Sequence, residues 1–194
     1  MKALTLYLRS RAVPTTAAAA FGCAVAFWAF GMTIDHPLGR ALAPLLTTLA
    51  ATTSIGLGLA GPDHDLDKTA AIAWPPRRAA HIIVAGAAVL GLLVAAGLAG
   101  EQMASTAQLV RNVAGLTGLV ALGAVVLGAA RAPLIPVVWT LLVLGSASEP
   151  PTQPTYKVML TWMVQPAETR TAMVAAITIA VAGSLSYALL GSRR

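Results

Sequence analysis

The stretch GPDHDLDKTAAIAWPPRR, residues 61–78, is the most charge-dense segment of an otherwise apolar chain. It holds three of the seven acidic residues, Asp63, Asp65 and Asp67. Apolar runs lie on both sides of it, each about 20 residues long, which is the length that a helix needs to cross a hydrocarbon core of ~30 Å. The stretch therefore predicts a polar loop between two membrane spans.

The composition excludes a water-soluble globule. Of the 194 residues, 57% are hydrophobic and 10% are charged, whereas soluble domains carry about 25% charged residues. The net charge of +6 comes from basic residues placed one or two at a time at the ends of apolar runs. That placement favours contact with anionic lipid headgroups over nucleic acid binding. We therefore predict an all-α, polytopic membrane protein that forms a single transmembrane domain over residues 1–194.

Six spans can be placed along the chain. Residues 1–12 are basic and mildly amphipathic, which predicts an interfacial helix before the first span. Arg131 and Pro133 divide the apolar region 112–148, which as one helix would measure about 55 Å and overshoot the bilayer. A tight hairpin at Arg131 is therefore expected. The predicted spans cover residues 13–32, 41–60, 79–99, 112–130, 132–148 and 171–191.

The distribution of basic residues predicts the topology. With six spans, both termini lie on the same side as the 61–78 loop, and nine of the thirteen Lys and Arg residues fall on that side. The positive-inside rule then places both termini and this loop in the cytoplasm. The excess of Arg over Lys and the abundant Ala suggest a bacterial source, and hence a multi-pass protein of the inner (cytoplasmic) membrane.

The 61–78 loop predicts a short amphipathic helix over about residues 64–73. Asp63 follows a proline and can serve as N-cap, and the helix must end before Pro75 and Pro76 because a residue preceding proline avoids the α region. Such a helix either rests on lipid or docks a soluble partner. Metal binding is not expected, because ligands at these close spacings do not converge on a helix. The candidate docking residues are Asp63, Asp65, Leu66, Asp67, Ala70 and Trp74.

The 149–170 loop is the second informative segment. Prolines flank the apolar run TYKVMLTWMVQ, residues 155–165, which covers only about 16 Å as a helix and is too short to span. It predicts an interfacial helix or a re-entrant one, the latter only where other parts of the protein satisfy its backbone. It can act as a simple anchor or as a gate at the outer end. The candidate gate residues are Tyr156, Met159, Trp162 and Met163.

Polar and small residues inside the spans predict helix packing rather than catalysis. Pro44 is expected in the first turn of the second span. A cluster of hydroxyl side chains in the same span can bond back to main-chain carbonyls or bond across to other helices. Two small-xxx-small pairs favour close helix approach in the fourth span. The cluster consists of Thr47, Thr48, Thr52, Thr53 and Ser54, and the pairs are Ala114 with Gly118 and Ala124 with Gly128.

Catalytic, cofactor and metal sites are not predicted. Residues 101–111 are expected to form a short polar connection that ends at Arg111. Because Arg111, Arg131 and His81 all lie near the ends of spans, no ionisable residue is expected deep in the membrane, which counts against proton coupling. The phosphate-binding motif GxxxxGK[ST] does not occur in the sequence, so the chain is not expected to hydrolyse ATP. A non-catalytic membrane subunit is the prediction.

The order of these parts resembles the permease subunit of ABC-2-type exporters. That family has an N-terminal interfacial helix, six spans, a coupling helix between spans two and three, and short re-entrant helices between spans five and six. The counterparts here are 1–11, 63–74 and 155–165. The resemblance implies half of a translocation pathway, pairing with a second permease chain as a homo- or heterodimer, and a separate ATPase that docks on the 61–78 loop. It does not indicate the substrate or the direction of transport.

Two other functions fit the same composition. One is the substrate-binding membrane subunit of an energy-coupling-factor-type vitamin importer, which resembles this chain in length and span number and docks through small residues in span one. Ala20 and Ala24 could serve there. The other is a structural or assembly subunit of a larger membrane complex, with no transport pathway of its own.

Overall fold

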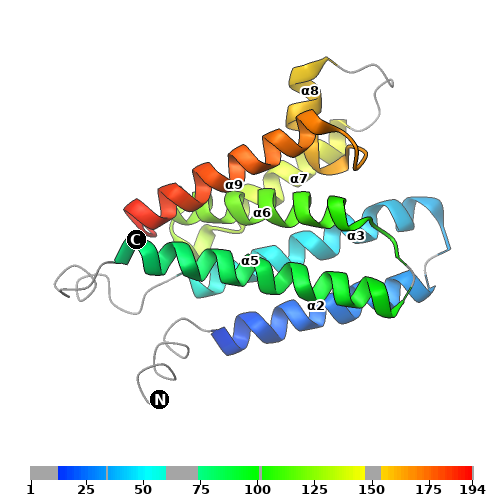
Figure 1. Cartoon of the computed structure of the whole chain (residues 1–194), viewed down its shortest axis with the longest axis horizontal. Coiled ribbons are helices and arrows are strands. Elements are labelled where there is room, and N and C mark those ends of the chain that lie inside the picture. Colours follow the sequence, from blue (N-terminus) through cyan, green and yellow to red (C-terminus); the bar gives the residue numbers. More distant parts are fainter. Residues whose placement is uncertain (1–12, 34, 60–73, 101, 147–153, 194) are drawn as a thin grey trace.

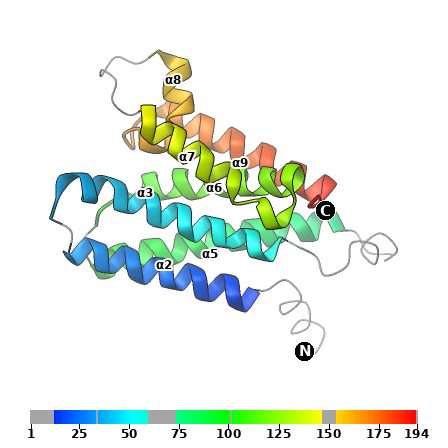
Figure 2. The same cartoon turned by 180° about the vertical axis from the view of Figure 1, so that it is seen from behind.

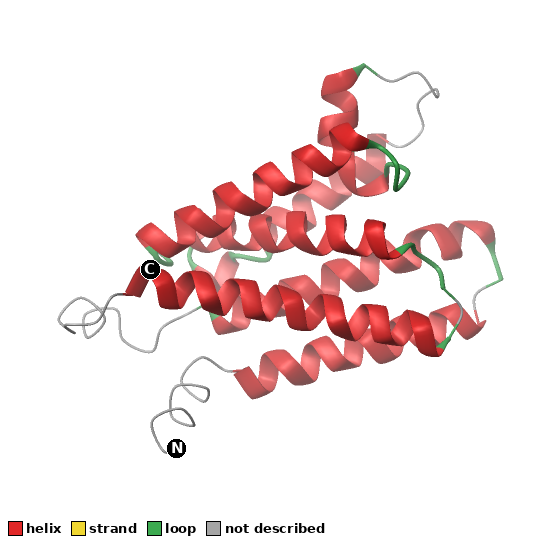
Figure 3. Cartoon of the chain, in the orientation of Figure 1, coloured by secondary structure: helices red, strands yellow, loops and turns green. Residues whose placement is uncertain are grey.

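The computed structural model describes residues 13–33, 35–59, 74–100, 102–146 and 154–193, and all regular structure in these residues is helical (Figures 1 and 3). The predicted all-α class is confirmed for this part of the chain. The elements in chain order are α2 (Val13–Thr33), α3 (Pro37–Thr53), η1 (Ser54–Gly58), α5 (Trp74–Ala99), α6 (Thr106–Leu127), η2 (Ala129–Arg131), α7 (Leu134–Ser146), α8 (Thr155–Leu160), η3 (Trp162–Val164) and α9 (Arg170–Leu190).

Within the described ranges, five helical segments are long and apolar enough to cross a membrane. They are Pro37–Gly58, Trp74–Ala99, Thr106–Leu127, Ala129–Ser146 and Arg170–Leu190. Helix α2 contributes a shorter apolar stretch, Pro14–Phe30. The helical membrane class is therefore supported, and the count of six spans stays a prediction.

The long helices run up and down, and α6 lies at the centre (Figures 1 and 2). Helix α6 contacts α3, α5, α7 and α9, whereas α2 packs on the outside against α3 and α5. The start of α2, the start of α5 and the end of α9 lie at one end of the bundle, called here the terminal end. Helix α8 lies at the opposite end, called here the capped end.

The closest helix crossing joins α6 and α9 at two glycines. A Cβ at Gly118 would lie 2.6 Å from the Cα of Ala180, and a Cβ at Gly183 would lie 2.7 Å from the carbonyl carbon of Gly118. Close packing of this kind is what small residues permit in a membrane. The prediction that small residues of the fourth span permit close helix approach is therefore confirmed for Gly118. Gly128 instead ends α6, with a φ of 89° that residues with a side chain rarely adopt.

Helix α3 begins earlier than the sequence predicted. It starts at Pro37, so Pro44 lies in the helix interior and not in its first turn. A proline there leaves one main-chain carbonyl of the preceding turn without its usual partner. The hydroxyl cluster behaves as predicted, because each of its members donates to a carbonyl three or four residues back, at distances from 2.6 to 3.3 Å.

Helix α5 also begins earlier, and this corrects the interpretation of Trp74. Trp74 is the first residue of α5, and Pro75 and Pro76 occupy its first turn. Proline is tolerated there because the first N–H groups of a helix have no intrahelical acceptor in any case. Trp74 therefore belongs to the long α5 helix, while the helix expected over 64–73 lies outside the described residues.

Helix α6 begins six residues before the predicted span. Ser105 is its N-cap: the Ser105 hydroxyl accepts from the main-chain N–H of Gln108 at 3.2 Å, and the Gln108 side chain accepts from the main-chain N–H of Ser105 at 3.0 Å. This reciprocal pair is a capping box, which fixes the start of a helix. As a consequence, Arg111 lies in the second turn of α6 and not in a polar connection.

Candidate functional site

The capped end of the bundle is covered by a broken helical segment, residues 154–166, called here the capping segment (Figure 1). The sequence predicted one helix over 155–165. The structure instead has α8 followed by η3, with a break at Thr161, whose φ and ψ are −96° and 23°. The Thr161 hydroxyl donates to the Lys157 carbonyl at 2.8 Å. The segment therefore turns sharply at Thr161 and inserts its second half into the bundle.

The four predicted gate residues divide into two pairs. Trp162 and Met163 are buried, 0% and 2% exposed, in a cluster that includes Leu116 of α6. Tyr156 and Met159 lie on α8 and are 60% and 43% exposed. The structure thus brings Trp162 and Met163 into contact with the bundle and leaves the other two on the surface.

Arg111 fastens the capping segment to α6. Its guanidinium donates from Nη1 to the Pro166 carbonyl at 2.8 Å and from Nη2 to the Gln165 carbonyl at 2.6 Å. Nε donates to the Asn112 side chain at 3.3 Å, and the exposed Glu168 carboxylate interacts favourably with the cation. Arg111 is only 1% exposed. Burial of a charge is costly unless it is hydrogen-bonded, so this geometry is what keeps the arginine inside.

Two further side chains complete the attachment. The Asn112 amide donates to the Met163 carbonyl at 3.2 Å, and the Trp139 indole of α7 donates to the Leu160 carbonyl at 3.1 Å. Irregular backbone at membrane depth is tolerated only where other groups satisfy it. Arg111, Asn112 and Trp139, called here the clasp, do this for four carbonyls of the capping segment.

Sequence reasoning missed the clasp. Arg111 was interpreted as a residue of a polar connection, because an arginine at the edge of an apolar run usually marks a membrane boundary. The signal that could have found it is the Ser105-x-x-Gln108 capping box. It moves the start of the helix back by six residues and therefore places Arg111 and Asn112 inside it.

The Trp162 ring packs against the main chain of α6 at Gly115, where a larger residue would not fit. A Cβ at Gly115 would lie 2.8 Å from Cζ2 and from Cζ3 of the ring. We expect Gly115→Ala to lower the free energy of unfolding by about 1–2 kcal/mol, because the ring must shift and overpacking is costly. In a Trp162→Phe background the shorter ring leaves room, so the same change should cost less than half as much. Thermal unfolding of the purified single and double variants measures this coupling, and additive effects would contradict the contact.

The predicted docking residues are mostly beyond what the structure describes. Asp63, Asp65, Leu66, Asp67 and Ala70 lie outside the described residues, and only Trp74 is placed, half-buried at the start of α5. The importer alternative relied on an accessible face of span one. Ala20 and Ala24 are 4% and 5% exposed and pack inside the chain's own bundle.

The described residues at this site hold the chain in place by hydrogen bonds and apolar contacts. Among them, no cluster of three or more His, Cys, Asp or Glu side chains could hold a metal ion. The clasp and the capping segment supply hydrogen-bond donors and apolar surface, which can close a passage or hold a segment in place.

Comparison with protein-family models, with curated proteins and with solved structures gave no match. The function is therefore inferred from the geometry of the chain itself.

Proposed function

We propose that this chain is the membrane-spanning permease subunit of an ATP-driven, ABC-type exporter. In this proposal it crosses the inner membrane of a bacterium six times, with both termini in the cytoplasm. It forms half of a translocation pathway with a second permease chain and couples to a separate ATPase through the 61–78 loop. The observation that carries the proposal is a continuous packed connection from the two flanks of that loop to the capping segment.

The first step of this connection joins the loop flanks to the end of α9. On one flank, the buried Tyr187 hydroxyl donates to the Leu59 carbonyl at 3.0 Å. On the other flank, the Arg78 guanidinium lies beside Gly191. A Cβ built on Gly191 would lie 2.8 Å from Nη1 of Arg78. A force on the 61–78 loop would therefore act on the last turn of α9 from both sides.

The second step passes from α9 through α6 to the capped end. The main chains of α6 and α9 touch at Gly118 and Gly183, and a contact between backbones cannot yield as flexible side chains do. The start of α6 carries Arg111 and Asn112, which hold the capping segment. Movement of α9 would thus be transmitted to the segment that covers the opposite end of the bundle.

In this proposal the capping segment is the gate, with a closed position as in the structure and a second, open position. It is broken at Thr161, and its second half is held by side chains rather than by a continuous helix. Within the described part of the chain, the Trp162 indole N–H is buried without a hydrogen-bond partner. An unsatisfied buried donor costs about 1–3 kcal/mol. In the proposed gate, this cost raises the energy of the closed position relative to an open position in which the donor is satisfied.

Co-purification tests the proposal. The chain is expressed with the ATPase of the adjacent reading frame, and an operon without such an ATPase would contradict the exporter function. We expect a stable complex that is lost when Asp63, Asp65 and Asp67 are all replaced by alanine, with the helical circular dichroism unchanged. Asp35→Ala is the matched control, because this fully exposed carboxylate lies between α2 and α3, outside the 61–78 loop. An ATPase that stays bound to the triple variant would refute docking through the loop.

A further inference from the structure

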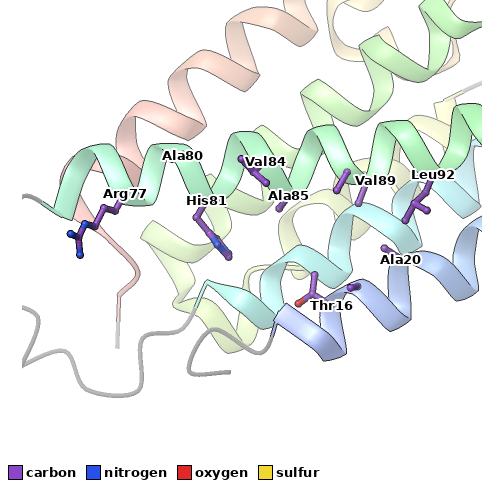
Figure 4. Close-up of a pocket in the computed structure, with 11 residues that line it drawn as sticks. Thr16, Ala20, Arg77, Ala80, His81, Val84, Ala85, Val89 and Leu92 are labelled. Atoms are coloured by element: carbon purple, nitrogen blue, oxygen red, sulfur yellow. The ribbon is translucent and has the colours of Figure 1, made fainter. Parts of the chain in front are cut away.

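A long apolar groove runs between α2 and α5 from the terminal end toward the middle of the bundle (Figure 4). Its volume is about 520 Å³, within the range of sites that bury small organic ligands. Alanine and valine side chains line most of it. The groove is distinct from the capping segment, and among the described residues of the 61–78 loop only Arg77 lines it.

The polar groups of the groove are gathered at one end. Arg77 and His81 lie in the first two turns of α5, and His81 projects toward α2 (Figure 4). Thr16, in the first turn of α2, contributes a hydroxyl oxygen that is buried and without a hydrogen-bond partner in the described part of the chain. A cation and a hydroxyl group therefore stand at the mouth, while the remaining lining is apolar.

The length of the groove matches one membrane leaflet. From Arg77 to Leu92 the lining follows α5 for about 22 Å at ~1.5 Å per residue. Half of a hydrocarbon core measures about 15 Å, and the headgroup region lies beyond it. An amphiphile with its head at Arg77 would thus extend its tail along Val84 and Val89 toward the bilayer centre.

We propose that this groove is a specific site for an anionic phospholipid of the surrounding membrane. One acyl chain occupies the apolar part, and the phosphate-bearing headgroup lies at Arg77 and His81, with the Thr16 hydroxyl available to an ester carbonyl. Basic pockets between helices near the membrane surface select anionic headgroups in this way. The site does not depend on the transport function proposed above.

Lipid retention by the full-length protein in a neutral detergent tests the site. Phosphatidylglycerol and phosphatidylcholine with identical acyl chains are added in equal amounts, and the retained lipid is measured by mass spectrometry. We expect a preference of about fivefold or more for phosphatidylglycerol, consistent with one basic residue at the surface. Arg77→Gln should abolish the preference. Arg131→Gln should preserve it, because Arg131 is exposed in η2, after the end of α6, and does not line the groove.

A second variant separates the headgroup from the acyl chain. Val84 is 66% exposed, so Val84→Trp should fold and should lower retention of both lipids by filling the groove; Ala88→Phe is the substitute if it does not fold. Equal retention of the two lipids by the wild type would overturn the proposal, as would unchanged retention in both groove-filling variants. A ready disulfide between cysteines at Leu8 and Ala88, in a Cys23→Ala background, would also overturn it by showing that the chain's own first residues fill the groove.

Discussion

Gly183→Ala is expected to lower the free energy of unfolding by about 3 kcal/mol, the upper end of what overpacking usually costs. The added Cβ would lie 2.7 Å from the carbonyl carbon of Gly118 and 2.9 Å from its Cα. These are main-chain atoms of α6, so no side-chain rotation can relieve the clash, and α6 and α9 must move apart. Unfolding of the purified protein by sodium dodecyl sulfate, followed by circular dichroism, measures the change.

Gly91→Ala is the matched control for this prediction. Gly91 also lies within a membrane-length helix, but a Cβ built there has no neighbouring heavy atom within 4 Å. Alanine favours a helix over glycine by about 1 kcal/mol, so Gly91→Ala should be neutral or slightly stabilising. Equal destabilisation by the two substitutions would show that glycine is needed for a reason other than the α6–α9 contact.

Much of the fold could be predicted because membrane helices are recognised from runs of apolar residues that are contiguous in the sequence. The apolar runs predicted six spans, and a helix lies at each of them in the described residues, five of them long and apolar enough to cross a membrane. The hairpin expected at Arg131 is present as η2 between α6 and α7. The prolines at 154 and 166 correctly bounded the short capping segment. Each of these features depends on residues that are close together in the chain, and hydrocarbon thickness limits the lengths that fit.

The parts that could not be predicted depend on distant contacts or on a choice between two local rules. Arg111 is buried because its acceptors lie 54 and 55 residues further along the chain, at Gln165 and Pro166. No property of its immediate neighbours shows that. Pro75 and Pro76 can either follow a helix or open one. The first alternative was chosen for Trp74, and the structure shows the second.

Arg111→Leu is expected to release the capping segment while leaving the bundle folded. The substitution removes the donors of two carbonyls, and hydrogen bonds to a charged group contribute about 1.5–3 kcal/mol each. Part of this loss is offset because a costly buried charge is removed as well. In the proposed gate, we expect the packed position of the segment to lose about 2–3 kcal/mol, which raises the population of the proposed open position roughly 30- to 150-fold.

A buried reporter measures the release. In a Cys23→Ala background, a Met163→Cys protein carries its thiol at a position that is 2% exposed, so a polar maleimide reacts only when the segment opens. Arg111→Leu should accelerate this reaction by the factor given above. Two controls should show no acceleration. The first is a thiol placed at Tyr156, which is already exposed. The second is the Arg40→Leu variant, because Arg40 is an exposed arginine whose ion pair with Asp35 is long, at 3.9 Å.

Arg111→Lys distinguishes a geometric clasp from a simple charge. A lysine keeps the positive charge but presents a compact ammonium, which cannot reproduce the fork that reaches Gln165 and Pro166 together. If the two carbonyl bonds hold the segment, Arg111→Lys should label nearly as fast as Arg111→Leu. If attraction to Glu168 is what matters, Arg111→Lys should label as slowly as the wild type, and Glu168→Gln alone should accelerate labelling. The distances of 2.6 and 2.8 Å to the two carbonyls favour the first result.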